Sequence, residues 1–162
     1  MQLTRYTDYS LRLLMFLALQ DKERLVTITE TAEHFAIPRN HLVKIVNRLG
    51  HLGYVHTVRG KRGGIRLGRP SADISIGEVV RAVETTMEVE DCSSPPCPLL
   101  PMCQLKGLLN EAAAAFLAVL DRCTLQDLIE DPQGMSHVLR WPSDLDSGPP
   151  RDPALPSDDA LK

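Results

Sequence analysis

The sequence is poor in aromatic residues and has no long hydrophobic run. Only three Phe, three Tyr and one Trp occur among its 162 residues, although 43% of the residues are hydrophobic. The longest apolar run, residues 112–120, is far shorter than the roughly 20 residues that a membrane-spanning helix needs. The first residues do not have the shape of a signal peptide. We therefore expect a soluble, cytoplasmic protein with one ordinary domain and a tail, or with two small modules.

Acidic residues are missing from a long stretch of the first half. Between His34 and Ala72 there are eight Lys or Arg residues and no Asp or Glu. Residues 1–81 carry 13 basic and 7 acidic residues, and residues 82–162 carry 5 and 14, so the net charge of −3 divides into +6 and −9. A continuous basic block of this kind is typical of a site for a polyanion, and binding there should weaken steeply with salt.

The cysteines do not have the spacing of a zinc finger. Cys92, Cys97 and Cys103 follow the pattern C-x4-C-x5-C in a loop with four prolines, and no fourth Cys or His lies nearby to complete a tetrahedral zinc site. Proline interrupts helix and strand, so we expect a stiff loop that presents sulfur. Three thiols with wide, uneven gaps favour an iron–sulfur cluster; a redox-active pair or a zinc site is the alternative. Cys123, outside this loop, is expected to be a small buried apolar residue.

Residues 27–53 have the pattern of a helix-turn-helix. Residues 27–30 form a capping box that opens a helix to about Phe35. Pro38 suits the first position of a second helix, which runs to about Leu52 and ends at Gly53. In this motif the second helix enters the major groove, where Arg pairs with guanine and Asn with adenine. The candidate DNA-binding residues of this helix are Arg39, Asn40, His41 and Lys44.

A basic hairpin is expected directly after this motif. Residues 54–58 and 64–67 are β-branched and alternating, and the glycine-rich turn between them carries Arg59, Lys61 and Arg62. A hairpin in this place makes a winged helix, whose tip lies over a phosphate backbone or in a minor groove. The sequence does not distinguish base contacts from phosphate contacts among the helix residues Arg39, Asn40, His41 and Lys44.

Four further segments complete the expected architecture, which is mostly α with a small β wing (α+β). Residues 3–20 are predicted to be a helix, and the expected buried stripe is Leu3, Tyr6, Leu11, Leu14, Met15 and Ala18. Another helix should span residues 75–84. The helix at 104–122 is so apolar that we expect it to pack against its twin in a dimer. A short helix at 125–130 follows, and residues 141–162 have the composition of a disordered tail.

These motifs together resemble a known family. Residues 3–9, 39–45 and 58–67, with the C-x4-C-x5-C loop, are similar to the bacterial winged-helix repressors of the family that includes the iron–sulfur regulator IscR. The resemblance covers residues 1 to about 130. Its nitric-oxide-sensing branch is the better match. IscR-like members have a wider first gap and a histidine three residues after the third cysteine, where this chain has Lys106.

The resemblance implies a metal centre between two subunits. It implies a 4Fe–4S cluster, with 2Fe–2S as the less favoured alternative, bound by Cys92, Cys97 and Cys103. The fourth ligand in that branch is an aspartate near the N-terminus of the other subunit, which corresponds to Asp8. The competing carboxylates are Glu84, Glu88, Glu90 and Asp91.

The implied division of the chain is a DNA-binding domain at 1–84, a cluster loop at 85–103, a dimerisation segment at 104–131 and a tail at 141–162. The implied function is a homodimeric repressor of inverted-repeat operators that loses DNA binding when nitric oxide reacts with the cluster or the cluster is lost. A regulator that responds to iron or redox state is an alternative. An electron-transfer or cluster-carrier protein is another, and the basic hairpin argues against it. No nucleophile–base pair or nucleotide-binding loop supports an enzyme.

Overall fold

The computed structural model describes residues 2–89, 92 and 97–130. Its α-helices are α1 (Arg5–Ala18), α2 (Ile28–His34), α3 (Arg39–His51), α4 (Ile76–Val83) and α5 (Gln104–Asp121). The strands are β1 (Val55–Val58) and β2 (Gly64–Leu67), and the short 3-10 turns are η1 (Ser71–Asp73), η2 (Leu100–Met102) and η3 (Asp127–Ile129). The predicted tail at 141–162 and the carboxylates of Glu90 and Asp91 lie outside the described residues.

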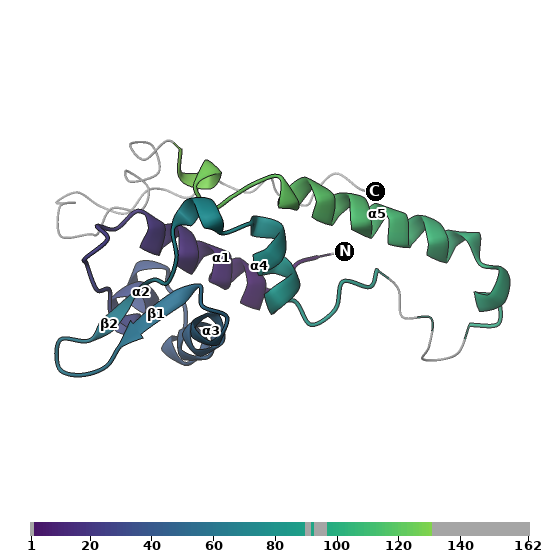
Figure 1. Cartoon of the computed structure of the whole chain (residues 1–162). Coiled ribbons are helices and arrows are strands. Elements are labelled where there is room, and N and C mark those ends of the chain that lie inside the picture. The colour runs from purple at the N-terminus through teal and green to yellow at the C-terminus, as the bar shows by residue number, and fades with distance from the viewer. Residues whose placement is uncertain (1, 90–91, 93–96, 131–162) are drawn as a thin grey trace, which may run out of the picture.

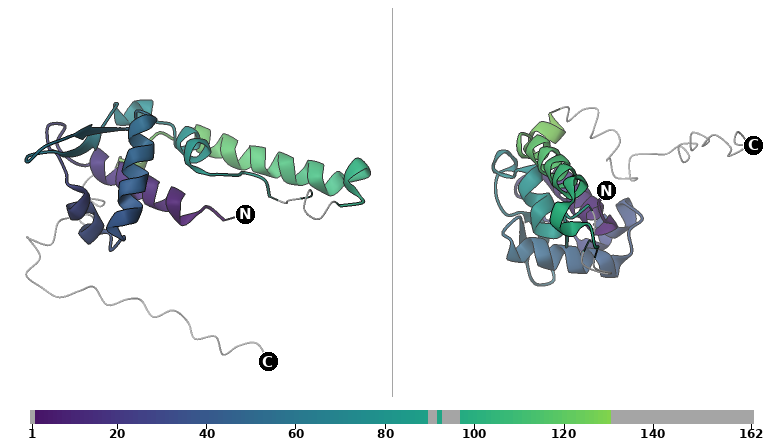
Figure 2. Two further views of the ribbon diagram at one scale, coloured as in Figure 1. Left: turned by 90° about the horizontal axis from the view of Figure 1, so that it is seen from below. Right: turned by 90° about the vertical axis from the view of Figure 1, so that its right-hand side faces the viewer.

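The chain forms two parts, which Figure 1 separates clearly. The body consists of α1 to α4, the β1–β2 hairpin and the final segment 123–130. The arm consists of η2 and α5, and its far end projects well beyond the body in both Figure 1 and Figure 2. The expected mostly α fold with a small β wing is confirmed.

The body is built around one hydrophobic core. Side chains from α1, α3, α4 and the last segment are fully buried there, among them Leu13, Leu14, Leu42, Ile45, Leu49, Val79, Val80 and Leu125. Side-chain N-caps start α1, α2 and α4, since Thr4, Thr27 and Ser75 each accept a hydrogen bond from a backbone N–H in the first turn, whereas α3 has no such cap.

Of the predicted buried stripe of α1, only Leu14 is fully buried, and the other five members are half-buried side chains that pack against the core. Leu13, Leu14, Phe16 and Leu17 are buried, whereas Leu11 and Met15 are only half-buried at the edge of the core. The reason is that α1 is surrounded by α3, α4, β2 and η3, so a wider face is covered. Ser10 also lies on this face, and its hydroxyl donates to the carbonyl of Tyr6 at 2.7 Å.

The helix-turn-helix follows the sequence closely. Thr27 and Glu30 form the predicted reciprocal capping box of α2. Pro38 is the N-cap of α3 rather than its first residue. Gly53 adopts φ +75° just after α3 ends, a left-handed conformation that glycine adopts without strain. In the turn between the helices Ala36 has φ +51°, which costs an L-residue energy.

The two strands form the expected wing. β1 and β2 are antiparallel, with Val55 opposite Leu67 and Val58 opposite Gly64. Val26 adds an isolated bridge to Ile65 through two backbone hydrogen bonds of 3.0 and 2.8 Å. This bridge ties the hairpin to the segment before α2, so the wing has a fixed base.

Among the described residues, the contacts that hold the arm on the body lie at the C-terminal end of α5. Beyond α5 the chain returns to the body, where Ile76 N donates to Cys123 O at 2.9 Å and Leu125 N donates to Ile74 O at 2.8 Å. Arg81 of α4 forms a two-pronged ion pair with Asp121, and Gly77 leaves room for that carboxylate, since a Cβ there would lie 2.0 Å from Asp121 Oδ1. The helix predicted at 125–130 is only the turn η3. Among the described helices, none is long and apolar enough to cross a membrane.

Candidate nucleic-acid interface and cysteine loop

The polar face of α3 carries the four residues predicted to enter a major groove. Arg39, Asn40, His41 and Lys44 are all exposed, while Leu42, Ile45 and Leu49 anchor the opposite face in the core. Asn40 Oδ1 accepts a hydrogen bond from His41 N at 3.0 Å, and its side-chain amide nitrogen can still donate two hydrogen bonds. Fixed backbone and exposed polar tips are what base-edge contacts require.

The wing turn presents the other three predicted residues. Arg59, Lys61 and Arg62 are exposed at its tip. Gly60 has φ +115°, and Gly63 packs so tightly that a Cβ would lie 2.3 Å from Val58 O. Glycine is therefore required at both positions for the turn to close and hold three positive charges together. The body thus carries exposed basic residues on both α3 and the wing turn.

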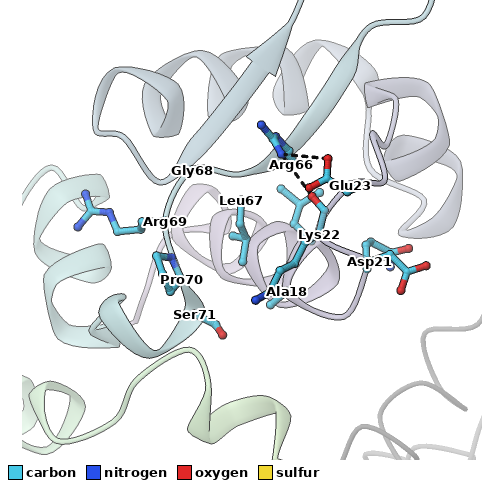
Figure 3. A pocket seen from close by; sticks show the side chains of 12 residues that line it. Ala18, Asp21, Lys22, Glu23, Arg66, Leu67, Gly68, Arg69, Pro70 and Ser71 are labelled. Carbon is cyan, nitrogen blue, oxygen red and sulfur yellow. Dashed lines mark hydrogen bonds and ion pairs between the residues drawn. The ribbon is translucent and has the colours of Figure 1, made fainter.

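Three other basic residues of the acid-free block have a different use. Arg66 donates to Lys22 O at 3.5 Å and lies 3.9 Å from Glu23, beside a cavity of about 390 Å³ (Figure 3). Arg69 points away from that cavity, donates to Leu52 O at 2.9 Å and stacks over the ring of Tyr54 at 4.4 Å. Arg48 donates to Ala82 O at 2.9 Å.

Arg48, Arg66 and Arg69 therefore stabilise the fold. A count of charges in the sequence could not distinguish them from basic residues that are free to bind a polyanion. The charged groups of Arg39, Lys44, Arg59, Lys61 and Arg62, by contrast, make no hydrogen bond or ion pair within the part of the chain that the structure describes. These five charges are the ones available to a polyanion.

The three loop cysteines are free, half-exposed thiols. Cys97 N donates to Cys92 O at 3.1 Å and Leu100 N donates to Cys97 O at 3.1 Å, and Cys103 is the N-cap of α5. Within the described residues, no group of three His, Cys, Asp or Glu side chains converges on one point. Three thiols on one loop match the donor set of an iron–sulfur cluster, and a fourth donor has to come from outside it.

Asp8 lies in the first turn of α1. Its carboxylate accepts a hydrogen bond from Arg12 Nε at 2.9 Å, and both side chains are nearly half exposed. Such an exposed i, i+4 pair is weak, so the carboxylate is released at little cost. Figure 1 shows the start of α1 on the body, well away from the cysteine-bearing end of the arm.

Glu84, one of the competing carboxylates, already has partners. Its Oε1 accepts from Thr4 N at 2.7 Å and from Thr4 Oγ1 at 3.2 Å. Eighty positions separate these residues, so no local pattern in the sequence indicates the contact. Glu88 is exposed on the segment after α4.

The remaining cysteine and the histidines fit structural roles. Cys123 is half-buried; burial, followed by the nearby carboxylate of Asp127, raises the pKa of its thiol. His34 stacks on Phe16, and burial lowers its pKa. His51 Nδ1 lies 2.6 Å from Asn47 O, and His56 is exposed.

Comparisons with known proteins agree with this geometry. Residues 3–131 match the Rrf2 family, described as an iron-dependent transcriptional regulator. The HTH-type transcriptional regulator NsrR of Bacillus subtilis (strain 168) is 48% identical over 86% of this chain and 98% of its own length. NsrR of Shouchella clausii (strain KSM-K16) is 44% identical over 87% of this chain and 97% of its own length.

Solved structures show the same fold. CymR of Staphylococcus aureus superposes with a TM-score of 0.64 at 28% identity, over 78% of this chain and 97% of that chain. IscR of T. potens superposes with a TM-score of 0.67 at 22% identity, over 91% of this chain and 94% of that chain.

Proposed function

Because this chain belongs to the Rrf2 family of transcriptional regulators, we propose that it is a repressor that nitric oxide releases from DNA. It is a DNA-binding transcription regulator and not an enzyme. The observation that carries the finer proposal is the set of three free thiols on the one loop that connects a basic winged helix to α5. The relatives named NsrR support the nitric-oxide signal.

In this proposal Cys92, Cys97 and Cys103 hold a 4Fe–4S cluster, and Asp8 of a second copy provides the fourth ligand. When bound, the cluster supplies an iron that reacts with nitric oxide. A carboxylate oxygen is a harder donor than thiolate sulfur, so Asp8 is the ligand expected to leave first. Arg12 is placed to take back the released carboxylate.

The apolar arm supports a homodimer. Leu105 and Leu108 are 60% and 62% exposed in the single chain, and α5 has no buried residue. Such a face in water calls for a partner, and a two-fold axis lets two copies of α5 cover each other. The dimer would place two α3 helices on the half-sites of an inverted repeat, one helical turn apart.

This proposal assigns a role to each part of the chain. Residues 1–84 bind DNA through Arg39, Asn40, His41 and Lys44 of α3 and Arg59, Lys61 and Arg62 of the wing. Residues 85–103 hold the cluster, residues 104–131 join the two copies, and the tail at 141–162 has no assigned role. The dimer acts in the cytoplasm, where thiols stay reduced.

A gel shift with anaerobically purified protein tests this function. DNA affinity should fall as a nitric oxide donor is added, and Cys97→Ser should bind like the nitric-oxide-treated wild type. Cys123→Ser is the matched control and should keep both the iron and the response. Unchanged affinity across the titration would refute the proposal. Native mass spectrometry of the same sample gives the subunit number and distinguishes 4Fe–4S from 2Fe–2S.

A second candidate is a regulator that responds to iron or redox state, which the description of the family as iron-dependent favours. Oxidised, reduced, iron-free and nitrosylated samples on one operator separate the two functions. A response to oxidation or iron loss without a response to nitric oxide would favour this candidate.

A further inference from the structure

Three elements meet where the body connects to the cysteine loop. They are the N-terminus of α1, the C-terminus of α4 and the middle of α3. Glu84, the C-cap of α4, binds Thr4, the N-cap of α1, through both the backbone N–H and the hydroxyl. A carboxylate at a helix N-terminus is favoured by the helix dipole as well as by these hydrogen bonds.

Two more hydrogen bonds connect this pair to α3. Arg48 Nη2 donates to Ala82 O at 2.9 Å, and Tyr6 OH donates to Lys44 O at 3.3 Å. Burial, the larger effect, raises the pKa of Tyr6 and the charge of Arg48 lowers it, so the phenol stays protonated and can donate. The recognition helix is therefore held by a side chain from α1 and holds α4 by a side chain of its own.

The junction is not closed by dense packing. A cleft of about 470 Å³ lies there, lined by Thr4, Tyr6, Arg48, Glu84 and their neighbours. Thr4, Tyr6, Arg48 and Glu84 are not buried. Where apolar contacts are few, directional hydrogen bonds set the relative positions of the elements, and these can exchange at low cost.

The junction lies close in the sequence to the cysteine loop and to Asp8. Cys92 follows Glu84 by eight residues, and Asp8 follows Thr4 by four. Lys44, whose carbonyl accepts from Tyr6, belongs to the exposed face of α3. The segments that lead to Cys92 and to Asp8 are expected to move when the cluster changes. They are thus joined to each other and to α3, the helix expected to bind DNA.

We propose that Glu84, Tyr6 and Arg48 are positioning residues that transmit the state of the cysteine loop and Asp8 to the recognition helix. The inference rests on the proposed function. It also assigns Glu84 a role other than metal ligand, because its carboxylate fixes Thr4. Releasing Glu84 from Thr4 frees the start of α1 from the end of α4 while the shared core holds the rest of each helix. A displacement of either helix end then no longer reaches α3.

The test uses the ratio of operator affinities of the full-length cluster-loaded and cluster-free protein. Coupling between two sites is commonly about 5- to 150-fold. Glu84→Ala should reduce the ratio to within about threefold of one, since the coupling is lost. Glu84→Gln keeps an oxygen that accepts from Thr4 and should retain most of the ratio. Glu88→Ala removes a nearby carboxylate without a partner among the described residues and should leave the ratio unchanged.

Tyr6→Phe removes a single hydroxyl and should lower the ratio by about 2- to 12-fold, the equivalent of one hydrogen bond. Tyr9→Phe is its control, because the Tyr9 hydroxyl has no partner in the described part of the chain. Iron content and far-UV circular dichroism of each variant establish that the fold and cluster loading are intact. If a variant loses structure, amide hydrogen exchange of the wild-type protein is measured instead. Removal of the cluster should then speed amide exchange in α3.

The outcomes separate the two claims. A wild-type ratio near one would overturn the proposed function and the transmission with it. A large wild-type ratio that Glu84→Ala leaves intact would overturn the transmission alone. Loss of iron in both Glu84→Ala and Glu84→Gln would make Glu84 a ligand and overturn its positioning role.

Discussion

The body and the arm solve the problem of burying apolar side chains in different ways. In the body, α1, α3 and α4 place leucines, isoleucines and valines in a shared core, where Leu13, Leu42 and Val79 are fully buried. In the arm, the 18 residues of α5 include no buried side chain. The body therefore completes its fold within one chain. The arm depends on something outside it, and this difference separates the part proposed to bind DNA from the part proposed to sense the signal.

A charge on the apolar face of the arm is the strongest test of this difference between body and arm. Leu108→Glu should raise the dimer dissociation constant by about 10²- to 10⁴-fold. Burial of a Leu side chain contributes about 1.5–3 kcal/mol to association. The two-fold axis places the substitution in both copies, so the loss is doubled. Sedimentation equilibrium measures the change. Asn110→Glu places the same charge on another side of α5 and should leave the dimer intact; equal effects would mean that α5 is not the interface.

A cavity in the body should have the next largest effect. Leu49→Ala should lower the free energy of unfolding by about 2–5 kcal/mol, since Leu49 is fully buried. This loss should not depend on protein concentration in urea denaturation. Leu105→Ala, in the arm, should cost stability only at concentrations where the dimer forms. Concentration-independent loss for Leu105→Ala would place that side chain in a core of its own chain.

A glycine in the helix-turn-helix should stabilise the body and leave the arm untouched. Ala36→Gly removes the strain of φ +51°, worth about 1–2 kcal/mol, and adds about 0.5–1 kcal/mol of backbone entropy cost. We expect a net gain of about 0.5 kcal/mol in the free energy of unfolding, measured by thermal denaturation. Ala32→Gly, inside α2, should lose stability instead. A destabilised Ala36→Gly would contradict the strain.

The smallest expected effect concerns the contact that joins the two parts. The hydrogen bonds from Arg81 hold the pKa of Asp121 below its ordinary value. A carboxyl whose pKa is lower in the folded state stabilises the fold above its unfolded pKa, and the contribution disappears as pH falls through the folded value. NMR titration should therefore give a low midpoint for Asp121, which Arg81→Met raises toward the ordinary value.

The control for this titration is Asp127, whose pKa is lowered by hydrogen bonds from the backbone and the side chain of Thr124. Its midpoint should not change in Arg81→Met. If both midpoints rise together, the substitution has loosened the whole end of α5 and not the ion pair alone.

Local signals in the sequence were sufficient for most of the body. The capping box at Thr27, the termination at Gly53 and the glycines of the wing each act within a few residues, so their patterns are visible in the chain. The buried face of α1 differs from the predicted stripe because the number of elements that surround a helix is not encoded in its own periodicity. The bridge of Val26 to Ile65 depends likewise on distant pairing.

The candidate site was only partly predictable for the same reason. Its basic residues were found from composition, but composition could not show that Arg48, Arg66 and Arg69 are held by carbonyl oxygens. Glu84 was taken as a candidate ligand because of its charge and place before the cysteines. Its contact with Thr4 joins residues from opposite ends of the body, and only the folded chain brings them together.

Within one chain, the contacts that hold α5 on the body lie at its C-terminal end among the described residues, so the helix can act as a lever about that end. A helix of 18 residues is about 27 Å long at 1.5 Å per residue. A tilt of about 10° at Asp121 therefore moves the end that bears Cys103 by about 5 Å. In the opposite direction, a displacement of one or two ångströms at the tip becomes only a few degrees of rotation at the pivot. A small force on the end that bears Cys103 therefore produces a large torque at the contact between α5 and α4.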